Sequence, residues 1–293
     1  MIRYLTKNRI DISKYDNCVS NSINSRIYGY SWFLNAVCDD WGVLALDDYT
    51  AVMPLPRRRK LGVDYIYLTP WVQQLGVFST EKIKPDLIES FIQKIPRKFK
   101  LIDIMLNSGN NFSSKHVNLR ENFILPLNTE NHRSLQKEYS KGRKSSIKQA
   151  QKFELVIQTT ATVNALIELF KNNKGADLKK TEHEYATLQK LVAKARELDK
   201  TVVYEVLNKS GKLIGGAIFL KDNSRITYLF SALNDEGRKK QAMSFLMDFV
   251  IEKYVNQPII LDFEGSMIPE IVSFYKSFGA KKEMYYHYKK YRL

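Results

Sequence analysis

The sequence has few residues that ligate metals or form disulfides, and it has no long apolar segment. It contains two cysteines, Cys18 and Cys38, and four widely spread histidines, without a closely spaced cluster of either type. A disulfide framework and a metal site are therefore both disfavoured. No apolar run approaches the roughly 20 residues of a membrane-spanning helix, and the first residues lack the apolar core of a signal peptide. We expect a cytoplasmic protein without membrane insertion.

Acidic residues are scarce relative to basic ones. The 293 residues include 46 Lys and Arg against 31 Asp and Glu, a formal charge of +15, and 44% of the residues are hydrophobic. Such a chain can bury a substantial core, in one large domain or two modest ones. The basic residues gather at 57–60, 133–152 and 276–292. This charge attracts polyanions such as coenzyme A or tRNA. The alternative is a solvated basic surface.

The second half of the chain has the clearest structural pattern. Apolar, β-branched runs at 201–207, 212–220 and 225–231 are separated by polar turns and predict three antiparallel strands. A helix follows, with apolar residues at helical spacing from Ala242 to Val250. A short strand at 258–263 and a helix at 269–277 complete the pattern. The segment therefore predicts a meander flanked by helices.

A basic loop precedes the long helix and contains Gly237, Arg238, Lys239 and Lys240. The free N–H groups and the dipole at the amino end of a helix favour a bound phosphate. The loop therefore predicts a cradle for a pyrophosphate, as in coenzyme A. The alternative interpretation is a solvated, basic first turn.

The first half repeats the order of the second. Strands are predicted at 41–46, 49–55, 63–68, 99–106 and 123–127, with an exposed loop at 57–60 and a helix at 85–95. We infer two similar domains, 1–127 and 128–293, each a mixed, mostly antiparallel sheet flanked by helices. The fold class is α/β (α+β).

Two further segments offer groups for binding. The loop at 69–76 carries Trp71, Gln73 and Gln74, whose amides can both donate and accept hydrogen bonds in a cleft; the alternative is a loop closed by its own side chains. The basic, helical segment 131–152 carries Arg143 and could guide an anionic substrate or remain a solvated helix.

The motifs Ile260-Leu-Asp-Phe-Glu-Gly-Ser266 and Phe274-Tyr-Lys-Ser-Phe-Gly279 resemble the ending of GNAT N-acyltransferases, most closely of the double-GNAT, Fem-like acyltransferases. The runs Tyr30-Ser-Trp-Phe-Leu34, Met53-Pro-Leu-Pro-Arg57 and Gln73-Gln-Leu-Gly76 are similar to the same group. The resemblance implies two tandem GNAT-like domains, of which the first is degenerate and the second holds the donor site. In the usual cofactor loop, this chain has Lys240 and Ala242 at the later glycine positions.

The resemblance also implies an activity and its residues. An acyl group would pass from acetyl-CoA or another acyl-CoA to an amine, of a small molecule or a peptide, in a cleft between the domains. Tyr275 would protonate the leaving thiolate, the alternative being a role in packing, and the backbone N–H groups of Phe230, Ser231 and Ala232 would polarise the carbonyl.

A base is also expected. Asp262 and Glu264 are alternate residues of a predicted strand, share one face and can accept the proton of an amine; the alternative for Asp262 is a structural cap. Two other functions remain open: an aminoacyl-tRNA-dependent peptidyl transferase of the Fem type, and a non-catalytic binding protein on a GNAT scaffold.

Overall fold

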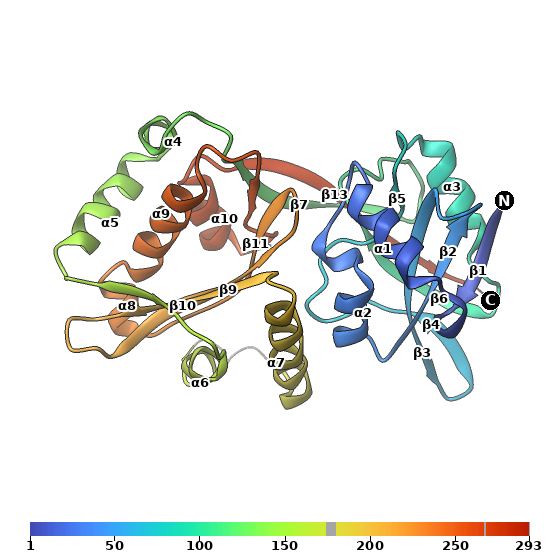
Figure 1. Cartoon of the computed structure of the whole chain (residues 1–293), viewed down its shortest axis with the longest axis horizontal. Helices are drawn as coiled ribbons and strands as arrows, with labels where there is room; N and C mark the ends of the chain where they lie inside the picture. The colour runs from blue at the N-terminus through green and yellow to red at the C-terminus, as the bar shows by residue number, and fades with distance from the viewer. Residues whose placement is uncertain (174–179, 267, 293) are drawn as a thin grey trace. The chain divides into compact units, whose positions relative to one another are not determined.

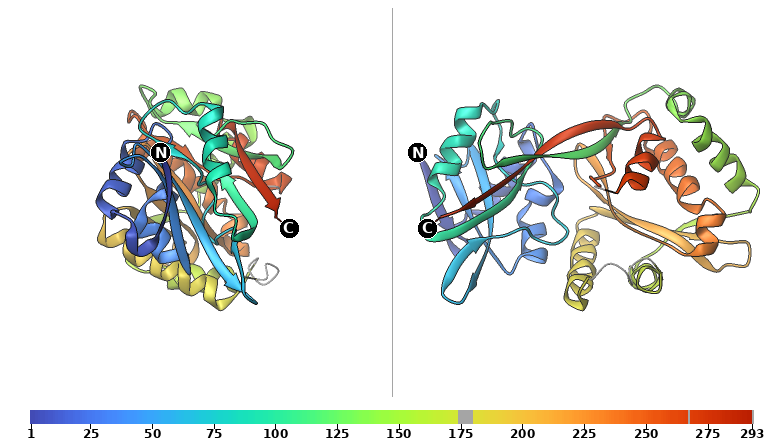
Figure 2. Two further views of the ribbon diagram at one scale, coloured as in Figure 1. Left: turned by 90° about the vertical axis from the view of Figure 1, so that its right-hand side faces the viewer. Right: turned by 180° about the vertical axis from the view of Figure 1, so that it is seen from behind.

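The computed structural model describes residues 1–173, 180–266 and 268–292. The chain forms two compact units, one of Met1–Glu121 with Glu283–Leu293 and the other of Asn122–Lys282. The chain enters the second unit within strand β7 (Val117–Pro126) and returns to the first within β13 (Lys281–Tyr291) (Figure 2). Both termini therefore belong to the first unit, whereas the expected division at residue 127 leaves the last strand in the second half.

The first unit contains a mixed sheet with the strand order β1-β2-β3-β4-β6-β13, and the short β5 pairs with β3. Neighbouring strands are antiparallel except for β4 and β6. Its other strands are β1 (Ile2–Thr6), β2 (Asp40–Leu46), β3 (Ala51–Lys60), β4 (Val63–Ile66), β5 (Phe78–Ser79) and β6 (Phe99–Leu106). Its helices are α1 (Ile12–Asn21), α2 (Ser31–Val37) and α3 (Pro85–Lys94), with short 3-10 turns at Lys7–Arg9 and Ile27–Gly29.

The second unit contains a sheet with the order β7-β12-β11-β10-β9-β8, in which only β11 and β12 run parallel. Its strands besides β7 are β8 (Val156–Thr159), β9 (Thr201–Leu207), β10 (Leu213–Lys221), β11 (Arg225–Leu233) and β12 (Ile260–Asp262). Its helices are α4 (His132–Glu138), α5 (Lys141–Gln151), α6 (Asn164–Lys171), α7 (Glu182–Glu197), α8 (Asp235–Lys239), α9 (Ala242–Tyr254) and α10 (Pro269–Lys276).

Helices cover both faces of this second sheet. In Figure 1, α4, α5, α9 and α10 lie on one face, and α6 and α7 lie on the other. The apolar side of α9 packs on the sheet because residues such as Leu246 and Val250 recur at helical spacing and are fully buried. A capping box in which Thr181 and Glu184 bond each other's backbone N–H begins α7. The core of the unit therefore lies between the sheet and these helices.

Several local predictions differ from the structure. The loop predicted at 57–60 is the end of β3, where Arg57–Lys60 pair with β4. Strands β1 and β13 were not predicted, because each is stabilised by pairing with a strand far away in the sequence. The helix expected from Gly237 onward is divided at Gln241, whose left-handed φ of 58° turns the chain between α8 and α9.

Candidate functional site

Strands β11 and β12 pair over only part of their length. The parallel pairing joins Arg225–Thr227 to Ile260–Asp262, where β12 ends, whereas β11 continues to Leu233. On its other edge, β11 pairs with β10 and bulges at Leu229. The segment that includes Phe230, Ser231 and Ala232 therefore has an edge that is not paired with β12. Backbone N–H and C=O groups on such an edge can bind an extended ligand.

Tyr275 lies where these two strands separate. Its ring centroid is 6.4 Å from that of Tyr228, the first residue of β11 beyond the pairing, and 5.0 Å from that of Phe263, the first residue after β12. The side chain comes from α10 and is 8% exposed. Both strands therefore hold the tyrosine at the point of divergence.

The phenol of Tyr275 is held in its protonated form. Burial raises its pKa well above the usual value, and the nearby Tyr228, Glu264 and Asp262 raise it further. Burial also raises the pKa of Tyr228 to about 12. A protonated phenol at this position can donate a proton to a basic leaving atom.

The two carboxylates near Tyr275 differ in their surroundings. The prediction that Asp262 and Glu264 share a strand face is wrong, because β12 ends at Asp262 and Glu264 has a left-handed φ of 59°. Asp262 is buried, and its oxygens accept hydrogen bonds from Arg225, Asn122 and the N–H of Glu264. Glu264 is half-buried. The structure therefore gives Asp262 three partners and leaves part of Glu264 exposed.

The predicted phosphate loop forms the short helix α8. Gly237 is buried, and a Cβ at this position would lie 2.2 Å from the carbonyl oxygen of Ile214, so glycine permits close packing on β10. The side chain of Asn234 caps the helix by accepting from the N–H of Gly237 at 2.8 Å. Asp235 and Glu236 place two acidic side chains in the first turn. A phosphate at this end would meet the cap and two negative charges.

The basic residues of this loop have different environments. Arg238 forms an ion pair with Asp235 at 2.5 Å, and Lys240 forms one with Glu236 at 2.8 Å. Lys239 is exposed. Two of the three cations predicted to bind phosphate are therefore engaged by neighbouring carboxylates.

Ala242 is the first residue of α9 and is fully buried. Gln241, which precedes it, makes no side-chain hydrogen bond that caps this helix. The amino end of α9 therefore differs from that of α8, which Asn234 caps.

Arg143 connects three helices of the second unit. Its Nε donates to Ser277 Oγ at 2.9 Å, and its Nη1 donates to Ser244 Oγ. The guanidinium lies 4.4 Å from the ring centroid of Phe274 and 4.7 Å from that of Phe278. Burial lowers its pKa to about 10. These contacts fasten α5 to the first turn of α9 and the end of α10.

The three predicted binding residues of the first unit lie in one loop. Gln74 is fully buried, donates to Gln73 Oε1 at 2.7 Å and accepts from the N–H of Ser108 at 3.2 Å. Trp71, which has a left-handed φ of 65°, and Gln73 are half-buried. The amide of Gln74 therefore holds the loop, whereas Trp71 and Gln73 keep some exposed surface.

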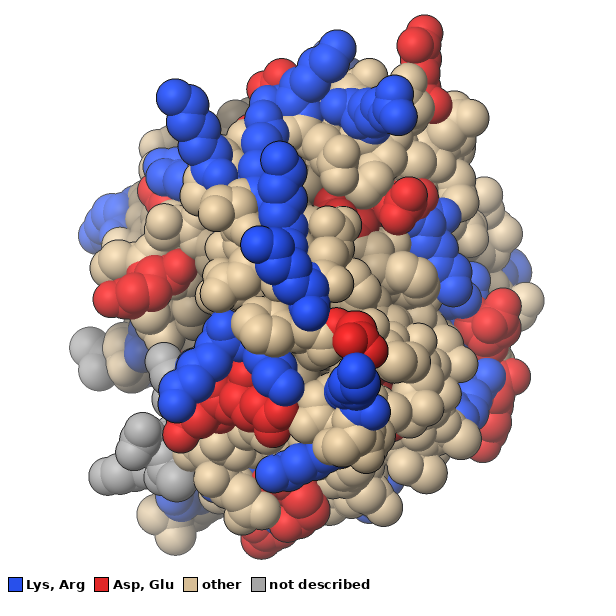
Figure 3. All heavy atoms as spheres, turned by 90° about the vertical axis from the view of Figure 1, so that its left-hand side faces the viewer, with Lys and Arg blue, Asp and Glu red and all other residues tan. Residues whose placement is uncertain are grey.

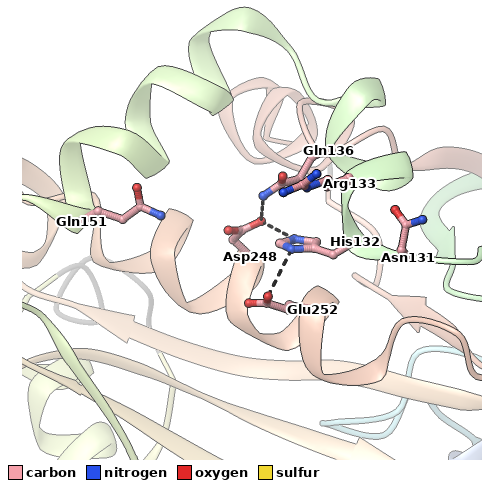
Figure 4. Close-up of a pocket in the computed structure, with 7 residues that line it drawn as sticks. All are labelled: Asn131, His132, Arg133, Gln136, Gln151, Asp248 and Glu252. Carbon is pink, nitrogen blue, oxygen red and sulfur yellow. Dashed lines mark hydrogen bonds and ion pairs between the residues drawn. The ribbon is translucent and has the colours of Figure 1, made fainter.

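A polar cavity that was not predicted lies between α4, α5 and α9. Its volume is about 400 Å³, and Figure 4 shows its lining residues, Asn131, His132, Arg133, Gln136, Gln151, Asp248 and Glu252. Asp248 Oδ1 is 2.8 Å from His132 Nε2 and accepts from Tyr139 at 3.1 Å. No sequence motif marks this group, because His132 of α4 and Asp248 of α9 are 116 positions apart in the chain.

One face of α4 and α5 is strongly basic. Lys and Arg side chains gather on the side of the molecule where α5 lies (Figure 3). Among the residues that the structure describes, the exposed cations of these helices and of the C-cap of α5 form no ion pair with a carboxylate. They are Arg133, Lys137, Lys141, Lys148 and the C-cap residue Lys152. Lys144, which donates to the backbone oxygen of Lys137, adds a sixth positive charge.

The part of the chain that the structure describes contains no group of three or more His, Cys, Asp and Glu side chains arranged to hold a metal ion. Within the same residues, no helix has both the length and the apolar character needed to cross a membrane.

Known proteins show the same domain and fold. Residues 133–269 match the family model of the acetyltransferase (GNAT) domain. The chain superimposes on the crystal structure of FemX with a TM-score of 0.70 and 13% identity, covering 97% of this chain and 96% of that one. L-PGS from Bacillus licheniformis gives a TM-score of 0.54 and 10% identity, covering 96% and 92%. Saccharomyces cerevisiae N-myristoyltransferase with bound myristoyl-CoA gives a TM-score of 0.50 and 10% identity, and the match covers 99% of this chain and 80% of that one.

No sequence among the curated proteins matches this chain. The expected resemblance is nevertheless confirmed, because the GNAT domain match includes β11, the start of α10 and the segment between them, while the FemX likeness extends over both units. Residues 133–269 match the GNAT acetyltransferase domain, and the fold of the whole chain is similar to that of FemX.

Proposed function

We propose that this protein is an N-acyltransferase whose reacting groups lie in the second unit, where β11 leaves β12. The observation that carries this proposal is the position of Tyr275 between Tyr228 and Phe263. The edge of β11 that extends beyond its pairing with β12 lies next to Tyr275 and suits an extended acyl donor. A protonated acid beside this edge can protonate the leaving atom of a donor that binds along it.

The transfer follows from these groups. The neutral amine attacks the carbonyl carbon of the donor, while backbone N–H groups in Phe230–Ala232 stabilise the developing oxyanion. The new C–N bond forms, and the bond from carbon to the leaving sulfur or oxygen breaks. Tyr275 donates its proton to the leaving atom, and a nearby carboxylate takes the proton that the amine loses. The acceptor is an amine of a small molecule or a peptide.

Acyl-CoA is the first candidate donor. A GNAT domain and the likeness to an N-myristoyltransferase with bound myristoyl-CoA support it. In this arrangement the extended arm of the donor adds to the edge of β11, and its phosphates lie toward Lys239 and the uncapped amino end of α9 at Ala242. The acidic first turn of α8 opposes this placement.

An aminoacyl ester of tRNA is the second candidate donor, and three observations favour it. Asp235 and Glu236 occupy the turn where the pyrophosphate of coenzyme A would bind. The raised pKa of Tyr275 suits the basic alkoxide that leaves an ester better than a thiolate, since a thiol has a pKa of about 8.5. The basic face of α4 and α5 offers contacts to a phosphate backbone.

Calorimetry with acetyl-CoA and a long-chain acyl-CoA, beside filter retention of a charged tRNA, separates these candidates. An acyl-CoA donor predicts saturable binding that weakens when Lys239 is changed to Ala. An ester donor predicts tRNA retention that Lys239→Ala leaves unchanged. Binding of either donor without any acyl transfer to amines would instead show a non-catalytic binding protein and overturn the proposed function.

A further inference from the structure

A buried charge pair holds the backbone where β12 ends. The side chains of Arg225 and Asp262 are 6% and 1% exposed, and Arg225 Nη1 donates to Asp262 Oδ2 at 2.7 Å. Asp262 Oδ1 accepts from Asn122 Nδ2 at 3.0 Å and from the N–H of Glu264 at 2.9 Å. Protonation of Asp262 would leave the buried guanidinium of Arg225 beside a neutral group, which is costly. Asp262 is therefore poorly suited to accept a proton.

Glu264 has the complementary properties. Its φ of 59° is in the left-handed region, which a residue with a Cβ adopts at a cost, and the hydrogen bond from its N–H to Asp262 stabilises that conformation. Its side chain is half-buried, so solvent or a substrate can reach it. The carboxylates of Glu264 and Asp262 both raise the pKa of Tyr275, so both act on its phenol.

We propose that Glu264 is the proton acceptor of the transfer and that Asp262, with Arg225 and Asn122, is a positioning residue that directs Glu264 toward Tyr275. The chemical role rests on the proposed function, whereas the positioning does not. As the C–N bond forms, the amine proton passes to the carboxylate of Glu264. As the bond to the leaving atom breaks, Tyr275 gives that atom its proton. Transfer of the proton from Glu264 to the phenolate of Tyr275 then restores both groups.

Fluorine NMR tests the positioning without a substrate. The protein is labelled with 3-fluorotyrosine, and Tyr275→Phe identifies the resonance of position 275. In the wild type this resonance should move with pH as the neighbouring carboxylate gains a proton. Glu264→Gln should abolish the movement and Asp262→Asn should reduce it, while the exposed Glu270→Gln, on the same helix as Tyr275, should leave it intact. An unchanged movement in Glu264→Gln or in Asp262→Asn would overturn the proposal.

A second variant is needed if Asp262→Asn does not fold, because it leaves Arg225 without its charge partner. The double variant Asp262→Asn with Arg225→Met removes both charges together. It should reduce the movement of the Tyr275 resonance in the same way, and an unchanged movement would contradict the positioning role.

Turnover tests the chemical role. With a donor that the wild type uses, Glu264→Gln should lower kcat/KM by about 10² to 10⁴ and remove the decline at low pH that titration of the base causes. Asp262→Asn should lower kcat but retain that decline. The reverse result would make Asp262 the base. If the wild type transfers no acyl group, the proposed function fails, and the fluorine titration still decides the positioning.

Discussion

At the scale of single residues, close contacts decide which side chain is tolerated. Gly237 and Gly142 are both in helices of the second unit, yet a Cβ at Gly237 would meet the backbone of Ile214, whereas a Cβ at Gly142 would have no atom within 4 Å. In the sequence, the two residues look alike, because each is a glycine within a basic segment. Only the structure shows that one of them is required by packing.

These two glycines give opposite predictions for stability. Gly237→Ala should lower the free energy of unfolding by about 1 to 3 kcal/mol, because the backbone of β10 must shift to accept the Cβ. Gly142→Ala should raise it by about 0.5 to 1 kcal/mol, because alanine is the better helix former in open space. Urea unfolding of both variants measures the difference. Equal effects on both would contradict the packing at Gly237.

His132 should make stability depend on pH. Burial lowers its pKa, but the hydrogen bond and charge of Asp248, with the charge of Glu252, outweigh burial and raise the pKa above its usual value. A raised folded-state pKa adds stability that is fully present below the unfolded value of about 6.5 and is lost as the pH rises through the folded value. The destabilisation by His132→Gln should therefore be larger at about pH 5.5 than at about pH 8.5. A difference that grows with rising pH would contradict this ion pair.

At the scale of elements, local pattern and long-range pairing differ in how well sequence reveals them. Strands β9, β10 and β11 and helix α9 were predicted because their residues repeat with a clear period and are bounded by turn residues. Strand β13 was read only as a basic block, since its pairing with β6 joins residues far apart in the chain. Tyr275 was found through its motif, but the contacts that separate Asp262 from Glu264 depend on Asn122 and Arg225 and have no local signal.

Arg143 should matter for the docking of α5. Arg143→Met removes the hydrogen bonds that the guanidinium donates to Ser244 and Ser277. It should lower the free energy of unfolding by about 1 to 3 kcal/mol. Arg143→Lys should restore only part of it, because lysine lacks the planar fork that bonds both hydroxyl groups. Hydrogen exchange of α5 measures the effect locally. Full rescue by lysine would contradict the two-hydroxyl contact.

The basic face of α4 and α5 predicts salt-dependent binding of a polyanion. Replacing Lys141, Lys144 and Lys148 by Gln should reduce the slope of log affinity for tRNA against log salt concentration by about 2 to 3, because each lysine releases about one counterion. A control triple variant, Lys82, Lys84 and Lys94 to Gln in the first unit, should change the slope less. Equal losses in both variants would assign the binding to overall charge instead of this face.

At the scale of the whole molecule, the order of units along the chain matters. The last strand, β13, pairs with β6 and so belongs to the first unit, although the residues of the second unit lie between these two strands in the chain. The similar order of predicted strands and helices in the two halves indicated two domains. This order could not show that the chain returns to its first unit. That return depends on pairing across almost the whole sequence.

Deleting residues 281–293 should therefore act on one unit selectively. Strand β6 loses its partner β13, so its amides should exchange with solvent faster in the truncated protein. The amides of β9 and β10 in the second unit should keep their protection. Hydrogen exchange followed by mass spectrometry measures both. Equal loss of protection in the two units would contradict the independent packing of the second.

The central claim, that Tyr275 supplies the proton to the leaving group, is tested most directly by comparing two donors in the wild type and in Tyr275→Phe. One donor is an alkyl ester or thioester, whose leaving atom needs a proton, and the other is its activated aryl analogue, which leaves as a stable anion. The account predicts a loss of about 10² to 10⁴ in transfer rate with the alkyl donor and almost none with the aryl donor. An equal loss with both donors, or no loss with the alkyl donor, would contradict it.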